Sequence, residues 1–276
     1  MNKFVIIFVV VTFVFLTVAC SSGDALEEEQ VVEDVEMVTE ETIEDGAEPE
    51  ASIIDESEIE LKIEQVERVP RYILQSDHTV KPIDELGDQQ VVLLTIDDAP
   101  NRYSVEMANL LKEKDVNAIF FVNGHFINDE AGREKLKTIY ELGFEIGNHT
   151  MNHPNLKNLS EEKQRQEIIE LNDLIEEITG ERPRFFRAPF GVNTEVSKQV
   201  VTEESMQWMN WTYGYDFNKE YMEKNALADI MVNTTLLRPG ANLLMHDHPW
   251  TLEALPDIIE GLKEKGYGFV DPKEIE

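Results

Sequence analysis

The sequence predicts an α/β fold in which a parallel sheet closes into a distorted (β/α)7 TIM-like barrel. From residue 91 onward, seven short runs rich in β-branched and aromatic residues alternate with segments of helical periodicity. Chemically capable polar residues follow five of these seven runs, always on the C-terminal side. In a barrel these positions share one rim, where active sites of this architecture lie. In an open, doubly wound sheet, which is the alternative, they would spread along an edge.

The first twenty residues indicate export from the cytoplasm. Lys3 precedes an almost wholly apolar run at residues 4–18, which is shorter than the roughly 20 residues that a membrane-spanning helix needs. We therefore interpret residues 1–19 as a signal peptide and not as a membrane anchor. Small residues then lead into Cys20, the only cysteine of the chain, so no internal disulfide is expected.

The segment before Cys20 resembles the lipobox of bacterial lipoproteins, although Thr17 stands where leucine is usual. The resemblance implies cleavage before Cys20, lipidation of its thiol and attachment to the membrane through that lipid. Ordinary secretion with cleavage after Ala19 is the alternative. With the lipid, the protein would be extracytoplasmic, anchored to the cell membrane and facing the cell wall.

Residues 20–70 are expected to form an acidic, disordered tether ahead of a domain at residues 71–276. Within this segment, residues 24–68 hold 19 Asp and Glu against Lys62 and Arg68, and they contain no aromatic residue. Such a composition cannot bury enough apolar surface to fold. A binding tail for a basic partner is the alternative. The rest of the chain is also acidic, which argues against nucleic-acid binding because that depends on Lys and Arg.

The expected strands and helices follow from periodicity and from end signals. The clearest helix spans residues 160–179, because Ser160 can cap its start, acidic residues follow, and Gly180 is placed to end it. Trp208 and Trp211 lie in an expected strand and are interpreted as core residues. The seven expected strands are residues 91–96, 118–122, 144–147, 184–187, 207–211, 242–245 and 268–270.

Asp98, His149 and His153 offer the donor atoms of a divalent-metal site. One carboxylate and two imidazoles suit zinc and leave a position open for water. The two histidines, at i and i+4, would share a face of a single helical turn, and Asp97 could act as a general base. Alone, an Asp pair is more often a turn or a helix cap, and paired histidines arise by chance. The same donor set occurs in non-haem iron oxygenases, but there Asp97 would have no role.

The stretch from about residue 91 to residue 270 resembles the NodB-homology polysaccharide deacetylases, carbohydrate esterase family four. Four ordered motifs carry the resemblance. The family motif TFDDGP stands here as TIDDAP, H[ST]xxH as HTMNH, RxPxG as RAPFG and LxH as LMH, at residues 95–100, 149–153, 187–191 and 244–246. The resemblance implies a distorted barrel of about seven β/α units and a metal-dependent deacetylase.

The resemblance also implies a role for each matching residue near the metal. Asp98, His149 and His153 would bind a divalent ion, zinc before cobalt or another ion. Asp97 would be the catalytic base. Arg187 would orient Asp97 and keep it ionised, because a guanidinium lowers the pKa of a neighbouring carboxyl.

On the substrate side, the resemblance implies that His246 is the general acid that protonates the leaving amine. The backbone N–H of Phe190, next to Pro189 in the third motif, would help to stabilise the oxyanion. Leu244 would line the acetyl pocket.

The sequence departs from the family pattern at three places. Ala99 replaces a glycine, which narrows the allowed backbone conformations there, and Phe190 replaces a tyrosine. The fourth motif, DxxDW, is matched only by Asp216 and Phe217 at its end. Asp216 would polarise His246, and Phe217 would take the place of a groove tryptophan.

We therefore expect a monomeric, lipid-anchored hydrolase that removes N-acetyl groups from a cell-envelope glycan. Peptidoglycan is the expected substrate, because the anchor would place the domain outside the membrane beside this polymer. An O-acetyl esterase of the acetyl-xylan type and a non-catalytic glycan-binding lipoprotein are the alternatives. A metal phosphoesterase would need a second metal site or a phosphate-binding cluster of Lys and Arg, and the sequence shows neither.

Overall fold

The protein was analysed as a computed structural model that describes residues 69–84 and 87–276. The expected signal peptide, Cys20 and nearly all of the acidic segment lie outside the described residues. No helix within the described part is long and apolar enough to cross a membrane.

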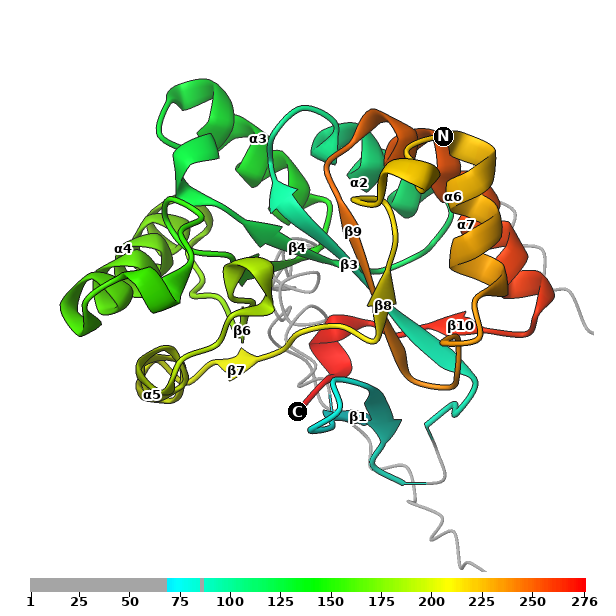
Figure 1. Ribbon diagram of the computed structural model, residues 1–276, viewed down its shortest axis with the longest axis horizontal. Helices are drawn as coiled ribbons and strands as arrows, with labels where there is room; N and C mark the ends of the chain where they lie inside the picture. The colour runs from blue at the N-terminus through cyan, green and yellow to red at the C-terminus, as the bar shows by residue number, and fades with distance from the viewer. Residues whose placement is uncertain (1–68, 85–86) are drawn as a thin grey trace, which may run out of the picture. The chain divides into compact units, whose positions relative to one another are not determined.

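An eight-stranded, wholly parallel sheet forms the centre of the domain and curves into a barrel (Figure 1). The strand order is β7-β6-β5-β4-β3-β9-β8, with β10 also paired to β3. Because β7 and β8 stand at the two ends of this order, the barrel is open between them. The α/β barrel prediction is confirmed. The strands are β3 (Val91–Ala99), β4 (Ile119–Val122), β5 (Glu145–Asn148), β6 (Phe185–Phe186), β7 (Gln207–Trp208), β8 (Tyr213–Gly214), β9 (Ala241–His246) and β10 (Gly268–Phe269).

The helices lie around the outside of this sheet (Figure 1). The predicted helix α4 begins and ends as expected: the Ser160 hydroxyl accepts a hydrogen bond from the Lys163 amide, and Gly180 has a φ of 82°. The α-helices of the described residues are α2 (Ser104–Glu113), α3 (Glu130–Glu141), α4 (Glu161–Thr179), α5 (Glu195–Glu203), α6 (Lys224–Asn233) and α7 (Pro249–Glu264).

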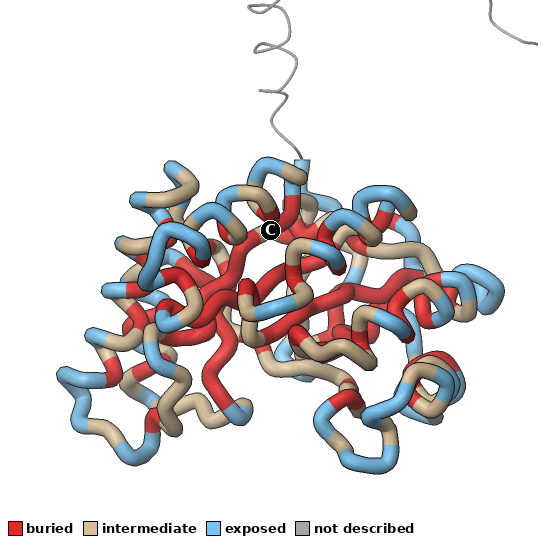
Figure 2. The backbone as a smooth tube through the Cα atoms, turned by 90° about the horizontal axis from the view of Figure 1, so that it is seen from above, coloured by how far each residue is buried: buried red, intermediate tan, exposed pale blue. Residues whose placement is uncertain are grey.

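The core has two main parts, because the strands are covered on both faces. Buried residues run along the central strands in Figure 2. In β3, Leu94 and Ile96 pack in the larger cluster with the surrounding helices, and Leu93 packs in a second cluster with Phe121 and Phe185. Side chains alternate along a strand, so Asp97 lies on the same face of β3 as Leu93.

A short antiparallel hairpin lies near the N-terminal ends of the strands. It consists of β1 (Tyr72–Leu74) and β2 (Val80–Pro82). The amide of Val80 donates to the carbonyl of Gly240, which directly precedes β9, at 2.8 Å, and Tyr72 forms an isolated bridge with Ile275. The hairpin is therefore at the opposite end of the sheet from the predicted site.

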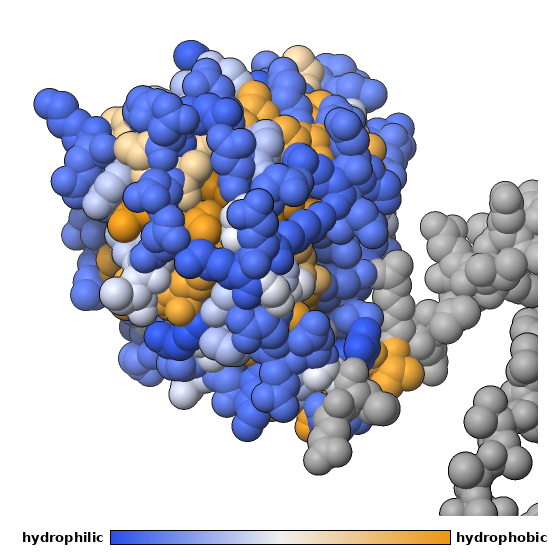
Figure 3. Space-filling view, turned by 90° about the vertical axis from the view of Figure 1, so that its right-hand side faces the viewer, coloured by the Kyte–Doolittle hydropathy of each residue, from blue (hydrophilic) through white to orange (hydrophobic). Residues whose placement is uncertain are grey.

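Two details of the sheet differ from the prediction. The strand expected at residues 207–211 ends at Trp208, and the two-residue strand β8 was not expected. A strand of two residues shows no periodicity, so the sequence carries no signal for it. The face seen in Figure 3 is mainly hydrophilic, with hydrophobic side chains in limited areas between charged and polar ones.

Candidate active site

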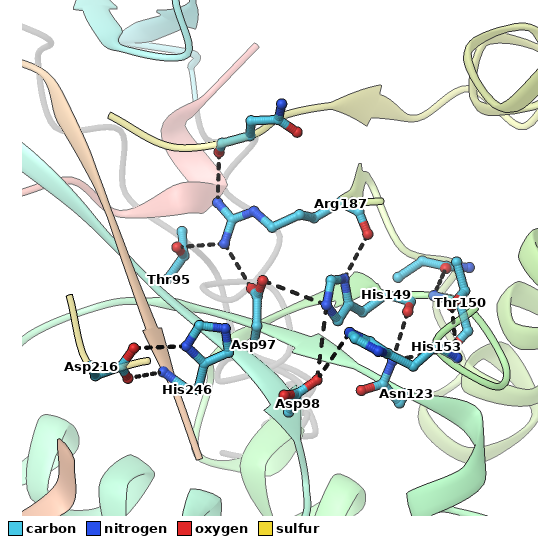
Figure 4. Close-up of polar contacts among 12 residues, drawn as sticks. Thr95, Asp97, Asp98, Asn123, His149, Thr150, His153, Arg187, Asp216 and His246 are labelled. Carbon is cyan, nitrogen blue, oxygen red and sulfur yellow. Dashed lines mark hydrogen bonds and ion pairs between the residues drawn. The ribbon is translucent and has the colours of Figure 1, made fainter. Parts of the chain in front are cut away.

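The polar residues predicted at strand ends meet at the C-terminal end of the sheet (Figure 4). Asp97 and His246 are register partners at the ends of the adjacent strands β3 and β9. His149 directly follows β5, and Arg187 directly follows β6. The barrel thus brings together residues that are separated by up to 149 positions in the sequence.

Asp98, His149 and His153 have ligand atoms that all lie within 4.8 Å of one another. The Asp98 Oδ1 atom is 3.9 Å from His149 Nε2 and 3.6 Å from His153 Nε2. His149 Nδ1 lies 2.6 Å from the Arg187 carbonyl oxygen. A carbonyl can only accept, so Nδ1 carries the proton and Nε2 keeps its lone pair toward Asp98. This tautomer and this donor set fit a divalent metal ion.

The turn that carries the two histidines is not helical, so the expected helical turn is wrong. Thr150 and His153 have φ angles of 69° and 55°, in the left-handed region. Asp98 and Phe190 share this conformation, with φ angles of 61° and 60°. Each such residue costs on the order of 1–3 kcal/mol, and such strain collects at functional sites where the surrounding structure imposes it. This bend, which stands in place of a helical turn, points both imidazoles toward Asp98.

Two buried asparagines hold this turn, and the sequence analysis missed both. Asn123 donates to the carbonyl oxygen of His149 at 2.6 Å. Asn148 accepts from the amide of Thr150 at 2.8 Å and donates to Asn172 at 2.7 Å. Asn148 ends the strand before the histidine motif, but an asparagine there has no sequence signal that separates it from a loop residue.

Arg187 is fully buried and forms an ion pair with Asp97, as the resemblance implies. Its Nη1 atom donates to Asp97 Oδ1 and to Thr95 Oγ1, each at 2.7 Å. Its Nη2 atom donates to the carbonyl of Asn210 at 2.9 Å, and its guanidinium lies 4.3 Å from the centre of the Phe121 ring. The side chain is therefore fixed from three sides.

The ionisation of Asp97 follows from this pairing. Burial alone would raise the pKa of the Asp97 carboxyl, but the positive charges of Arg187 and His246 outweigh it and lower the pKa below its ordinary value. Burial also lowers the pKa of the His149 imidazole, against the opposing effect of Asp97. At neutral pH the site therefore contains an anionic Asp97 beside a neutral His149.

His246 is held by Asp216, the residue that the weak fourth motif indicated. Asp216 Oδ1 lies 2.8 Å from His246 Nδ1, and Asp216 Oδ2 accepts from the His246 amide at 2.6 Å. The Thr251 hydroxyl also donates to Asp216 Oδ2, and the Trp250 indole N–H donates to the backbone carbonyl of Asp216. Burial alone would lower the pKa of His246, but the buried Asp216 carboxylate outweighs it and raises the pKa to about 9. His246 is therefore protonated at neutral pH, with Nε2 not engaged by Asp216.

A cavity of about 340 Å³ opens above these groups. Its walls include Leu244 and the exposed rings of Phe190 and Phe217. Trp211 also lines it, so its assignment to the core is wrong, and Pro189 is buried in the turn behind the wall. The lining residues are Asp97, Asp98, His149, His153, Phe190, Trp211, Phe217, Leu244 and His246.

Ala99 fits its position without strain. It is the last residue of β3, it is fully buried, and it is not among the residues with positive φ. The left-handed conformation falls on the preceding Asp98. A glycine is therefore not required at residue 99 in this chain.

Comparisons with known proteins agree with this geometry. A family model for polysaccharide deacetylases matches residues 85–225. A peptidoglycan-N-acetylglucosamine deacetylase of Bacillus cereus is 33% identical over 188 residues, which cover 65% of this chain and 66% of that protein. The peptidoglycan-N-acetylmuramic acid deacetylase PdaC of Bacillus subtilis is 30% identical over 206 residues, which cover 74% of this chain and 41% of that protein. The chain thus spans less than two thirds of either relative.

Solved structures share the same fold. The structure of PdaC matches with a TM-score of 0.60 and 29% identity, covering 68% of this chain and 90% of the PdaC chain. A CE4 family pseudoenzyme from Bacillus anthracis matches with a TM-score of 0.61 and 30% identity, covering 68% of this chain and 65% of the other. With its family-model match over half of the chain and its four motifs gathered around one cavity, this protein belongs to the polysaccharide deacetylase family.

Proposed function

We propose that the protein is a metal-dependent hydrolase that removes N-acetyl groups from a cell-envelope glycan, with peptidoglycan as the substrate. One observation carries the proposal: an anionic Asp97 beside the metal-ligand set shares the cavity with a protonated His246. Hydrolysis of an amide needs both a base for the attacking water and an acid for the leaving nitrogen. The relatives named as peptidoglycan deacetylases support the choice of substrate.

Asp98, His149 and His153 are the proposed metal ligands, with zinc as the first choice and cobalt or another divalent ion as the alternative. When bound, the ion would supply Lewis-acid activation of water and of the acetyl carbonyl. The hydrogen bonds and backbone conformation of the ligand residues orient their donor atoms for metal binding. His149 presents an unprotonated Nε2 because its Nδ1–H donates a hydrogen bond to the backbone carbonyl of Arg187. Asp98 is held in a conformation that turns its carboxylate toward both imidazoles.

We assign proton transfer to Asp97 and His246, the register partners on β3 and β9. Asp97 takes the proton from the attacking water, and Arg187 keeps this carboxylate oriented and ionised before the reaction. His246 then gives its Nε2 proton to the departing nitrogen, so that the C–N bond breaks to release acetate and a free amine. Asp216 holds Nδ1 during this step and stabilises the charged imidazolium.

We assign the binding of the substrate to the residues of the cavity wall. The backbone N–H of Phe190, placed by the turn at Pro189, is the proposed donor to the oxyanion. Leu244 would contact the acetyl methyl group, since it lines the cavity on β9. Phe217 and Phe190 expose their rings at the cavity wall, where they can pack against a sugar ring.

The cellular setting is proposed from the sequence outside the described domain. Lipidation at Cys20 after removal of residues 1–19 would anchor the protein to the membrane, and residues 20–70 would let a monomeric domain at residues 71–276 reach the wall. If coil-like, a tether of this length spans ~40 Å, and repulsion between its like charges extends it further.

Acetate release from purified peptidoglycan tests the proposal. We expect release by the metal-loaded protein, loss after chelation, and recovery when zinc is added back. Release that persists in the chelated protein would contradict the metal dependence. Parallel assays on chitooligosaccharide and acetyl-xylan decide between an N-deacetylase and an O-acetyl esterase. Glycan binding without acetate from any substrate would favour the non-catalytic alternative, which similarity to a pseudoenzyme keeps as a second candidate.

A further inference from the structure

We propose that Asp247 is a positioning residue for the deacetylation reaction proposed above. Its carboxylate holds the β3–α2 loop, residues 100–103, against the end of β9. In this way it fixes Asp98, which lies two residues before that loop near the end of β3, relative to His246, which precedes Asp247. The inference rests on the proposed function for its catalytic meaning.

The Asp247 carboxylate is buried, and both of its oxygens accept hydrogen bonds. Its Oδ1 atom accepts from the amide of Tyr103 at 2.8 Å, and the amide of Arg102 is shared between Oδ1 at 3.1 Å and Oδ2 at 3.0 Å. Its Oδ2 atom accepts from the amide of Ser104 at 2.8 Å and from the Ser104 hydroxyl at 2.5 Å. The side chain is only 3% exposed, and hydrogen bonds to a buried carboxylate are among the strong ones.

These contacts cap helix α2 from the residue that follows β9. Tyr103 stands at the N-cap position and makes no side-chain capping bond. In contrast, α3 is capped locally by Asp129, which accepts from the amide of Gly132 at 2.8 Å. A local cap would be enough to stabilise the start of α2. A cap supplied from residue 247 also ties the helix start to β9.

This link between α2 and β9 matters because Asp98 has no register partner in the neighbouring strands. The pairing of β3 with β9 ends at Asp97 and His246, and the pairing of β3 with β4 is irregular between Ile96 and Ala99. Asp98 falls in this gap and has a φ of 61°. The Asp247 amide donates to the Asp97 carbonyl at 3.2 Å. Asp247 therefore contacts the chain on both sides of Asp98.

Zinc affinity and amide exchange of the full chain test this inference. In Asp247→Asn, one acceptor oxygen becomes an amide that faces backbone donors. We expect zinc binding, measured by competition with a chromogenic chelator, to weaken about tenfold, as for other residues that orient ligands. We also expect faster deuterium uptake at amides 102–104 and a lower kcat with little change in KM.

Ser104→Ala and Asp129→Asn complete the design. Ser104→Ala removes one of the four donors to the Asp247 carboxylate and should shift zinc affinity and exchange in the same direction by less. A poorly folded Asp247→Asn would therefore not end the test. Asp129→Asn alters a helix cap outside the site and should leave zinc affinity and kcat unchanged. Unchanged affinity and kcat in both loop variants, or equal losses in Asp129→Asn, would overturn the inference.

The same experiment separates this inference from the proposed function. If the wild-type chain binds no zinc and releases no acetate, the proposed function fails. Exchange at amides 102–104 needs neither metal nor substrate. Unchanged exchange there would then show that Asp247 does not hold the loop, and faster exchange would show that it does.

Discussion

The floor of the cavity and its wall are built in different ways. At the floor, Asp97 and Arg187 are 2% and 0% exposed, and strand register and hydrogen bonds fix both. At the wall, Phe190 and Phe217 are 63% and 45% exposed and lie outside the β-strands. Residues from all four motifs form the floor, whereas Phe190 and Phe217 at the wall differ from the family pattern. From this difference we infer that the buried part determines the reaction and the exposed part the choice of glycan.

Removing a metal ligand should have the largest effect. Asp98→Ala deletes the carboxylate that lies within 4 Å of both imidazoles and forms the proposed ligand set with them, so we expect zinc binding and acetate release to fall to background. Metal analysis after dialysis and an acetate assay check this. Asp77→Ala, at an exposed carboxylate paired with Arg238, is the control and should keep both. Normal zinc content in Asp98→Ala would remove Asp98 from the ligand set.

Breaking the buried ion pair should have the next largest effect. Arg187→Met leaves the buried Asp97 charge without its partner and should lower the free energy of unfolding by about 3–5 kcal/mol. Arg133→Met breaks an exposed pair with Glu177 and should cost at most about 1 kcal/mol. Urea unfolding at pH 7 compares the two.

The pH dependence of this difference has a definite sign. The pKa of Asp97 is lowered from 3.8 in the folded state, so the stabilisation is present above that pH and disappears as the pH falls through the lowered value. Equal destabilisation by Arg187→Met and Arg133→Met would contradict a special role of burial at the floor.

Most of the floor could be predicted from the sequence, because its residues belong to motifs at strand ends. Asp97, His149, Arg187 and His246 all lie where the strand pattern placed them. The bend at Thr150 could not be predicted, because a left-handed residue in HTMNH has no signal of its own, and the supporting Asn148 looks like any loop residue. Trp211 was misassigned because the strand expected at residues 207–211 ends at Trp208, so strand alternation does not determine where the Trp211 side chain lies.

His246, the proposed general acid, lines the same cavity as the floor and wall residues. The pH dependence of acetate release tests its role. Asp216→Asn removes the charge that holds the pKa of His246 at about 9, so the pKa should fall toward the ordinary 6.5. Activity needs protonated His246 and should therefore decline at lower pH in the variant than in wild type. Asp257→Asn, at an exposed pair with Lys224, should leave the profile unchanged. Coincident alkaline limbs in wild type and Asp216→Asn would exclude His246 as the acid.

Changing the wall should have the smallest effect on chemistry. Phe217→Ala removes a ring that is 45% exposed, so stability should change by about 0.5 kcal/mol or less. We expect KM for a glycan oligomer to rise severalfold while kcat stays close to wild type, since uniform binding is lost. Leu236→Ala, at a residue that is 43% exposed, is the matched control. A fall in kcat at constant KM would place Phe217 in the chemical step.

The central claim is that the buried Asp97 performs proton transfer beside a metal that it does not need to bind. Acetate release from peptidoglycan by zinc-loaded Asp97→Asn, with zinc content measured on the same sample, tests this most directly. The account predicts zinc content equal to that of wild type and a rate lower by about 10²- to 10⁴-fold, the usual contribution of a general base. A zinc-loaded variant that releases acetate at the wild-type rate would contradict it.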